Sequence, residues 1–320
     1  MAHHHRSLRH RILSETAKET LGALPPILKA LPNINARKGF LIRSNELEPL
    51  QPLQSEAFKL PSGKAGFVTQ VLNDDTLDVA IRLTREKTSP ARVLVLNLAS
   101  DITPGGGWLK GSLAQEESIC YRSSLYLGLP KGVYPLPKQS AVYTPDVIIV
   151  RDAFGAGHQL IQKEPSELDV ISVVSVAAIR RPEVMKAQKV YDGEIAMRET
   201  FAREGDRELT KTKMRTILRI AGKYEHTHLV LGALGCGAFK NPTEEIAYCW
   251  REVLAEKEFE GGWWEKVVFA VLDKGSDGDN AGRGGEGNFG TFERILGDVE
   301  FAAGSVPRKV HEVSTMGSGT

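Results

Sequence analysis

The sequence of 320 residues has few cysteines and no long apolar run. Its cysteines, Cys120, Cys236 and Cys249, are too few and too widely spaced for a disulfide framework or a cysteine-based metal site. This usage favours a reducing environment inside the cell, nuclear, cytoplasmic or both. No apolar stretch reaches the length of a membrane span, and the N-terminus lacks the apolar core of a secretory signal. We therefore expect no membrane partner.

An excess of charge of either sign is also absent. Lys and Arg number 41 and Asp and Glu number 40, so the formal net charge is +1. A general nucleic-acid-binding protein needs a strong positive field, so we expect no direct nucleic-acid partner. His3, His4 and His5 lie at the chain end, where such a run is typical of a tag or a solvated tail. We predict no metal site.

The remaining composition, 41% hydrophobic and 25% charged, is typical of a globular protein. Apolar, β-branched runs alternate with helical patterns, which predicts a layered α/β sheet with ligands at the carboxyl ends of its strands. We expect strands near 68–72, 93–99, 146–150, 169–176, 227–234 and 267–272, and helices near 6–30, 75–84, 112–127, 205–222 and 242–257. Pro25 and Pro26 should interrupt the first helix. Residues 32–66 are interpreted as an extended arm.

A triple-glycine run at 105–107 follows the apolar run 93–99, and Gln115-Glu116-Glu117 follows it after seven residues. Glycines allow a phosphate or a sugar to approach the main chain closely. Paired carboxylates cleave glycosidic bonds. The combination favours a hydrolase of a sugar attached to phosphate. Two solvated acids at a helix start are the alternative, and the adjacent glycine loop argues against it.

The two glutamates should lie at a helix start, because Ser112 and Gln115 match a capping box. Helical neighbours differ by about 100° in direction, so their roles should differ. A general acid must be protonated, whereas a helix N-terminus favours the carboxylate. Apolar walls and a bound diphosphate would both raise the pKa of such an acid.

A second glycine loop spans residues 232–239 after the predicted strand 227–234. Its glycines can present main-chain N–H groups to an anion, or can simply form a tight turn. Beside the first loop, diphosphate binding is favoured. Asn241, Pro242 and Glu244 predict the cap and first turn of the next helix. No Gly-Lys-Ser/Thr follows, so the loop is not a nucleotide P-loop.

Three further features have alternative interpretations. Asn97 either caps a chain turn or holds a sugar hydroxyl, and Phe239 is either core or a wall for a ribose. The sequence 285–290 matches G-x-G-x-x-G, but it is remote from the preceding strand and no βαβ unit follows, so a dinucleotide site is not expected. The Asp- and Gly-rich segment 274–287 is interpreted as a surface loop.

The segment from Asn97 through the triple glycine to Glu117, together with residues 232–242, resembles the microbial-type poly(ADP-ribose) glycohydrolases. The resemblance extends from about Arg37 to Leu296. That family carries a triple-glycine, short-spacer, Gln-Glu-Glu signature. The fold implied is a macrodomain-like mixed sheet between helices, with an N-terminal helical extension at 1–36, the catalytic domain at 37–300 and a tail at 301–320.

The resemblance implies hydrolysis of ribose–ribose bonds from the polymer terminus, with release of ADP-ribose through an oxocarbenium-like transition state. Glu117 would be the catalytic acid and Glu116 would hold ribose hydroxyls. Substrate-binding roles are implied for Asn97, Gly105, Gly106, Gly107, Gln115, Gly235, Cys236, Gly237, Ala238, Phe239 and Phe289. Among these, Asn97 would orient the terminal ribose, and either Phe289 or a residue near Asp273 would be an adenine wall.

The partners implied are poly(ADP-ribose), ADP-ribose and poly(ADP-ribosyl)ated proteins. No cofactor is implied, and we expect a monomer. Two alternatives remain: a macrodomain that binds ADP-ribose without cleaving it, and a hydrolase that removes single ADP-ribose units from protein side chains.

Overall fold

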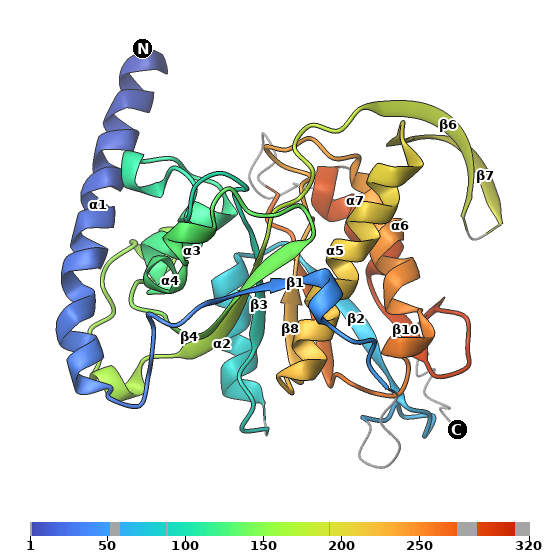
Figure 1. Cartoon of the computed structure of the whole chain (residues 1–320), viewed down its shortest axis with the longest axis horizontal. Helices are drawn as coiled ribbons and strands as arrows, with labels where there is room; N and C mark the ends of the chain where they lie inside the picture. The colour runs from blue at the N-terminus through green and yellow to red at the C-terminus, as the bar shows by residue number, and fades with distance from the viewer. Residues whose placement is uncertain (1, 52–57, 88, 192, 274–286, 311–320) are drawn as a thin grey trace, which may run out of the picture.

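A nine-stranded mixed sheet forms the centre of the protein (Figure 1). The computed structural model describes residues 2–51, 58–87, 89–191, 193–273 and 287–310. The strands of the sheet are β1 Phe40–Arg43, β2 Gly66–Leu72, β3 Leu94–Leu98, β4 Ser140–Ile148, β5 Val170–Val176, β8 His228–Leu231, β9 Lys266–Ala270, β10 Val299–Ala302 and β11 Arg308–Lys309. Their spatial order is β1-β4-β5-β3-β8-β9-β2-β10-β11.

The middle of the sheet is parallel. β3 pairs with β5 and β8, β8 pairs with β9, and β9 pairs with β2, all in parallel. The strands toward both edges, β1, β4, β10 and β11, pair antiparallel. The carboxyl ends of the five central strands therefore lie along one edge, where ligands bind in such sheets.

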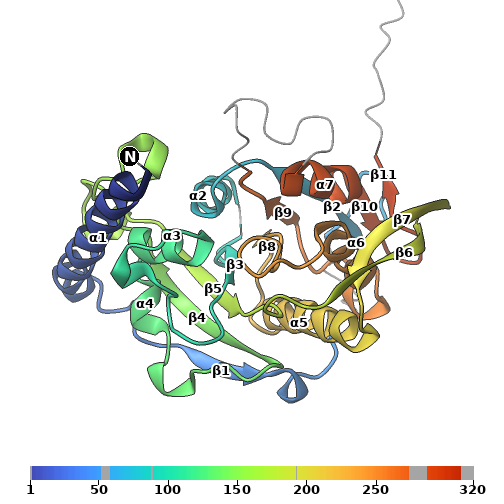
Figure 2. The same ribbon diagram turned by 90° about the horizontal axis from the view of Figure 1, so that it is seen from above.

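Helices cover both faces of the sheet (Figure 2). Their bounds are α1 Ala2–Ala30, α2 Thr76–Glu86, α3 Gln115–Arg122, α4 Leu125–Gly128, α5 Glu204–Lys223, α6 Thr243–Leu254 and α7 Gly287–Leu296. Residues of α1 to α4 share one buried cluster and residues of α5 to α7 share the other. This arrangement confirms the predicted mixed sheet between helices. None of the helices in the described ranges is long and apolar enough to cross a membrane.

The central strand β3 contributes to both clusters. Leu94 and Leu96 pack with the α5–α7 cluster, whereas Val93 and Val95 pack with the α1–α4 cluster. Alternate side chains point to opposite faces of a strand, and both faces are covered here. The continuous apolar run of the sequence is therefore a strand buried on both sides, as predicted.

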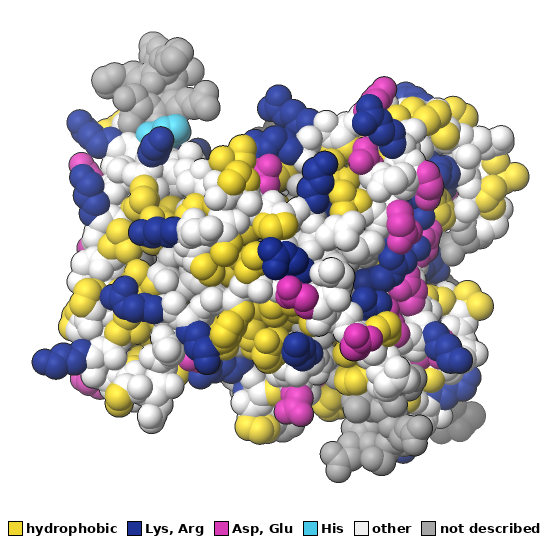
Figure 3. All heavy atoms as spheres, viewed as in Figure 1, with side chains coloured by type: hydrophobic (Ala, Val, Ile, Leu, Met, Phe, Trp, Pro, Cys, Tyr) yellow, Lys and Arg dark blue, Asp and Glu magenta, His cyan; other side chains and the backbone are white. Residues whose placement is uncertain are grey.

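Ion pairs join α5 to α6. Arg207 binds Glu245 and Glu252, and Arg219 binds Glu258, the residue that follows α6 in a short turn. Figure 3 shows basic and acidic side chains interleaved over this part of the surface. Each pair alone contributes little, but the network fixes how α5 lies against α6.

The structure differs from the predicted elements in three places. α1 continues through Pro25 and Pro26 instead of stopping there. The predicted arm 32–66 contributes β1, which pairs with β4. Within the predicted tail, β10 continues to Ala302 and β11 follows it, so the sheet extends through residue 309.

The structure contains a two-stranded hairpin that we did not predict from the sequence. It comprises β6 Val184–Tyr191 and β7 Glu194–Phe201, paired antiparallel and separate from the main sheet. β6 is largely exposed along its length, so it lacks the apolar alternation that predicts a half-buried strand.

Candidate active site

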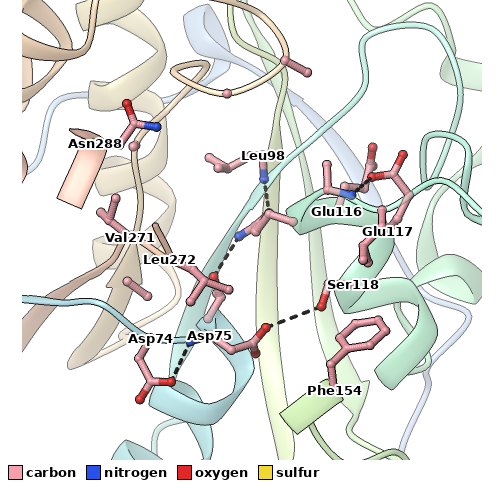
Figure 4. Close-up of a pocket in the computed structure, with 18 of the residues that line it drawn as sticks. Asp74, Asp75, Leu98, Glu116, Glu117, Ser118, Phe154, Val271, Leu272 and Asn288 are labelled. Carbon is pink, nitrogen blue, oxygen red and sulfur yellow. Dashed lines mark hydrogen bonds between the residues drawn. The ribbon is translucent and has the colours of Figure 1, made fainter. Parts of the chain in front are cut away.

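A cavity of about 910 Å³ opens at the carboxyl ends of the parallel strands. Its walls include residues that follow β2, β3, β8 and β9 (Figure 4). They are Asp74–Thr76, Leu98–Ser100, Ala233–Gly235, Gly237–Phe239 and Ala270–Leu272, together with the start of α3. The volume lies within the range of small-molecule sites, about 300–1,000 Å³. The structure thus places both glycine loops near the edge of the sheet where the sequence predicted a ligand.

The triple-glycine loop wraps around the carboxyl group of Glu117. The main-chain N–H of Gly107 donates to Glu117 Oε1 at 2.9 Å. Gly106 has φ +58°, and a Cβ at this position would lie 2.4 Å from Glu117 Oε1 and 3.1 Å from Glu116 Oε2. Two features therefore require glycine at position 106: its left-handed backbone conformation and the close approach of both carboxyl groups.

Glu117 also closes the first turn of α3. The N–H of Ala114, the residue before the helix, donates to Glu117 Oε2 at 2.8 Å. The predicted capping box of Ser112 and Gln115 is wrong, because the chain turns at Gly111 (φ +85°) and the helix begins at Gln115. Glu117 itself is the residue that reaches back to the helix start.

Gln115 joins the helix start to β3. Its Oε1 accepts the N–H of Leu98 at 2.8 Å, and its Nε2 donates to the carbonyl of Leu96 at 2.8 Å. The pairing of β3 with β8 ends at Val95, and both groups of the side-chain amide thus take the place of strand partners beyond that point. This contact holds the two glutamates at the end of the strand.

Glu116 is the more deeply buried of the pair, with 3% of its surface exposed. The Ser100 N–H donates to its Oε2 at 2.7 Å and Asn97 Nδ2 donates to its Oε1 at 3.3 Å. Burial raises the pKa of Glu116 to about 8, and the charge of Glu117 acts in the same direction. The hydrogen bonds from Ser100 and Asn97 oppose this rise without cancelling it. Glu116 therefore carries a proton at neutral pH.

Asn97 lies beneath Glu116 rather than on the cavity wall. It is fully buried at the end of β3, and its Nδ2 also donates to Ser175 Oγ at 3.0 Å. Its Oδ1 has no hydrogen-bond partner among the described residues. The sequence left two interpretations of Asn97, a chain cap or a sugar ligand. The contacts in this structure show another role, in which Asn97 positions the carboxyl group of Glu116.

The second glycine loop is shaped by Gly235 and Asn241. Gly235 has φ +79°, and a Cβ there would lie 2.5 Å from Asn241 Nδ2. Asn241 Nδ2 donates to the carbonyls of Ile179, at 2.7 Å, and Gly235, at 3.2 Å. The predicted cap is therefore wrong, because Asn241 braces the loop and α6 begins after Pro242. Cys236 is buried, and burial raises the pKa of its thiol to about 12.

Phe239 forms part of the cavity wall and is half-buried. The Arg180 guanidinium lies 4.5 Å from the centroid of its ring. Arg180 also forms an ion pair with Asp101, which belongs to the segment between β3 and the triple glycine. This chain of contacts connects the two glycine loops across the site.

The opposite end of the cavity does not contain the predicted ring of Phe289. Phe289 packs against the α5–α7 cluster, and its N–H donates to Asp273 Oδ2 at 3.3 Å. The cavity is lined there by Asp74, Leu272 and Asn288. The segment 274–287, apart from Gly287 at the start of α7, lies outside the described residues.

The sequence missed several wall residues. They include Arg9, Asp74, Leu98, Ser100, Phe154 and Asn288. Asp75 was predicted only as the cap of α2, which its hydrogen bond to the Leu77 N–H confirms. Of the predicted substrate-binding residues, Gly105, Gly106, Gly107 and Cys236 are not on the wall. No group of three metal-ligating side chains occurs within the described part of the chain.

The mixed sheet and the carboxyl pair beside two glycine loops define the class of the protein, a macrodomain-like α/β fold with a paired-carboxyl site at the ends of its strands. The family model "Microbial-type PARG, catalytic domain", that is poly(ADP-ribose) glycohydrolase, matches residues 37–152. This confirms the resemblance to the microbial-type poly(ADP-ribose) glycohydrolases.

Solved structures of poly(ADP-ribose) glycohydrolases have a similar fold. Poly(ADP-ribose) glycohydrolase from Thermomonospora curvata is 24% identical, with 89% of this chain and 99% of that chain covered and a TM-score of 0.66. The enzyme from Deinococcus radiodurans in complex with ADP-ribose is 29% identical, with 72% and 84% covered and a TM-score of 0.53. A further structure of the T. curvata enzyme, bound to the inhibitor ADP-HPD, is 24% identical with a TM-score of 0.62, again covering 89% and 99%. The search of curated proteins found no match.

Proposed function

We propose that this protein is a poly(ADP-ribose) glycohydrolase, a glycosidase that hydrolyses the ribose–ribose bond of the polymer and releases ADP-ribose. One observation carries the proposal. Glu117 is held by the main chain of the triple-glycine loop, on the wall of a cavity that the second glycine loop also lines. A carboxyl group is thereby fixed beside main-chain surfaces that can accept a sugar diphosphate.

The second glycine loop supports a placement for the diphosphate. Gly237 and Ala238 are exposed on the cavity wall, and Gly237 has no atom within 4 Å of an added Cβ. Phosphate oxygens can therefore approach this main chain closely. The distal ribose would then lie between Phe239 and Glu116, and the adenine would lie toward Asp74 and Asn288.

Glu117 would act as the general acid. It would protonate the oxygen of the leaving ribose and then activate water against the oxocarbenium-like centre. Glu116 would hold ribose hydroxyls and would also store a proton, because burial raises its pKa to about 8. The carboxyl groups of both glutamates lie close to Gly106, so the proton on Glu116 is held next to the proposed acid.

We further propose that the enzyme acts from the polymer terminus, as a monomer, on poly(ADP-ribosyl)ated proteins inside the cell. The family resemblance supports terminal cleavage. The three cysteines support a reducing compartment, since all three are free and buried.

Digestion of polymer of defined length, with products resolved by size, tests the function. We expect the wild-type chain to release ADP-ribose and the Glu117→Gln variant to lose about 10²–10⁴ of the rate while still binding ADP-ribose. Glu199→Gln, an exposed acid on β7, is the matched control and should retain full activity. Binding without any product would indicate a non-catalytic macrodomain. Turnover of mono-ADP-ribosylated protein alone would indicate the other hydrolase class.

A further inference from the structure

The cavity continues past the paired carboxyl groups to a second wall. This wall comprises Arg9 of α1, Leu113 and Ala114 before α3, and Phe154 of the short turn Phe154–Ala156. In both ribbon views α3 lies between α1 and the central sheet (Figures 1 and 2). Leu113 and Ala114 of this second wall immediately precede the first turn of α3, which carries Glu116 and Glu117.

α1 is firmly docked beside this wall. Ser14 Oγ donates to the carbonyl of Leu109 at 2.8 Å, and Thr20 Oγ1 donates to the carbonyl of Tyr121 at 2.8 Å. Gly111 lies against the main chain of His10, where a Cβ would come within 2.0 Å of the carbonyl oxygen. The position of Arg9 relative to the triple-glycine loop is thus fixed by contacts of the residues that follow it in α1.

Arg9 supplies an unneutralised positive charge. Its side chain is exposed, and no ion pair joins it to a carboxylate of the described chain. Burial raises the pKa of Tyr121, and the positive charge of Arg9 opposes this rise, so Arg9 lies close enough to act on this hydroxyl. Tyr121 lies one helical turn beyond Glu117, on the same face of α3. A guanidinium in this position suits a phosphate, which it can bind through two parallel hydrogen bonds.

Phe154 supplies a flat apolar surface. One face of its ring stacks on His158, with centroids 3.8 Å apart and planes 22° from parallel. Burial lowers the pKa of His158 to about 4, so this imidazole is neutral near pH 7. Figure 4 shows the Phe154 ring on the cavity wall near Ser118. Aromatic side chains in this setting stack on nucleobases.

Three acids that line the cavity are already paired. Asp75 and Asp78 bind the two ends of the buried Arg122 guanidinium, at 2.5 Å and 2.6 Å. Asp74 binds Arg82 at 2.8 Å. The charges of these three carboxylates are therefore balanced by arginines, and they repel a phosphate less than free carboxylates would.

We propose that Arg9 and Phe154 form a subsite for the leaving ADP-ribose unit of the polymer, with Arg9 on its diphosphate and Phe154 stacked on its adenine. The inference rests on the proposed function, because the bond cleaved at Glu117 joins the two units. A protein side chain that carries a single ADP-ribose offers neither group to this wall. The subsite therefore makes the enzyme prefer polymer over mono-modified protein.

Kinetics with two substrates test the subsite. One substrate is polymer, and the other is ADP-ribose that carries 4-nitrophenol at C1″ in place of a second unit. We expect Arg9→Ala and Phe154→Leu each to lower kcat/KM on polymer about tenfold and to leave the nitrophenyl substrate unchanged. Arg11→Ala, an exposed arginine of α1 outside the cavity wall, is the matched control and should change neither. Equal losses on both substrates, or no loss on polymer, would overturn the subsite.

Binding separates this inference from the proposed function. In the Glu117→Gln background, a dimer of ADP-ribose should bind about tenfold more tightly than ADP-ribose itself, and Arg9→Ala should remove the difference. If the wild type fails to cleave polymer while the dimer retains this advantage, the proposed function fails and the binding subsite stands. Equal affinity for dimer and monomer would refute the subsite whatever the activity.

Discussion

Gly106 lies directly against Glu117, so closely that a Cβ on Gly106 would come within 2.4 Å of Glu117 Oε1. The glycine also has φ +58°, a conformation that costs a side-chain-bearing residue about 1–2 kcal/mol. The backbone conformation of the triple-glycine loop therefore determines where the carboxyl group of Glu117 lies. Any side chain at residue 106 must displace the group that we assign as the acid.

The first prediction follows from this contact. Gly106→Ala should lower kcat on polymer by at least about tenfold, because displacing a catalytic group by about 1 Å is costly. Gly132→Ala is the control, since its added Cβ meets nothing within 4 Å and its φ is not positive. Steady-state rates and thermal unfolding of both variants give the comparison. A fully active Gly106→Ala enzyme would mean that Glu117 is not the acid.

The second prediction concerns pH. The pKa of Glu116 is raised from 4.5 to about 8, so the folded state binds a proton that the unfolded state releases across this range. Stability from this group is therefore complete below about pH 4.5 and is lost as the pH rises through 8, by about 1.4 kcal/mol per pH unit at most. Glu116→Gln should remove that slope.

Denaturant unfolding at several pH values between 5 and 9 measures the effect. The difference in unfolding free energy between Glu116→Gln and wild type should increase with pH in favour of the variant. Taking the difference between the unfolding free energies of the two proteins cancels the contributions of the other titrating groups. A difference independent of pH would show that Glu116 is ionised in the folded protein.

The third prediction concerns Gln115, whose amide replaces two strand partners at the end of β3. Gln115→Ala leaves the Leu98 N–H and the Leu96 carbonyl without these partners, so it should destabilise the protein by about 1–3 kcal/mol. It should also lower activity by moving the start of α3. Gln159→Ala, whose Nε2 donates only to the nearby Gly157 carbonyl at an exposed site, should do neither. Unfolding curves and polymer turnover of the pair decide this.

The sequence predicted where the site lies in the fold, but not where the helices beside it begin and end. Runs such as 93–99 have the pattern of doubly buried strands, so the ligand edge and the two glycine loops could be placed from local signals. The helix start could not, because S-x-x-Q matched a box that the turn at Gly111 displaces. The prediction that Pro25 and Pro26 interrupt α1 was also wrong. The neighbouring Leu24 is 2% exposed and Leu28 packs with it, so tertiary burial maintains the helix through the two prolines.

Residues that reach the site from distant segments gave no local signal. Arg9 lies in a helix outside the resemblance, and Phe154 follows β4 in a turn of ordinary composition. Only the docking of α1 against α3 brings the two to one cavity. Such a juxtaposition depends on tertiary packing, which periodicity and motif spacing do not encode.

The fourth prediction concerns this docking. The Arg151 guanidinium is 1% exposed and donates to Glu19 Oε2 at 2.6 Å, to Thr20 Oγ1 at 3.2 Å and to the His158 carbonyl at 2.8 Å. It thus joins α1 to the loop that carries Phe154. Glu19 is 55% exposed, so its own charge remains hydrated when the pair is broken.

The two partners should therefore differ in cost. Arg151→Ala removes buried packing and three hydrogen bonds and should destabilise the protein by about 3 kcal/mol or more. Glu19→Gln keeps an acceptor in place and loses only a solvent-screened pair, worth at most about 1 kcal/mol. Equilibrium unfolding in urea measures both. Equal losses in the two variants would show that the ion pair, rather than the buried bridge through Thr20 and His158, holds α1 against the catalytic helix.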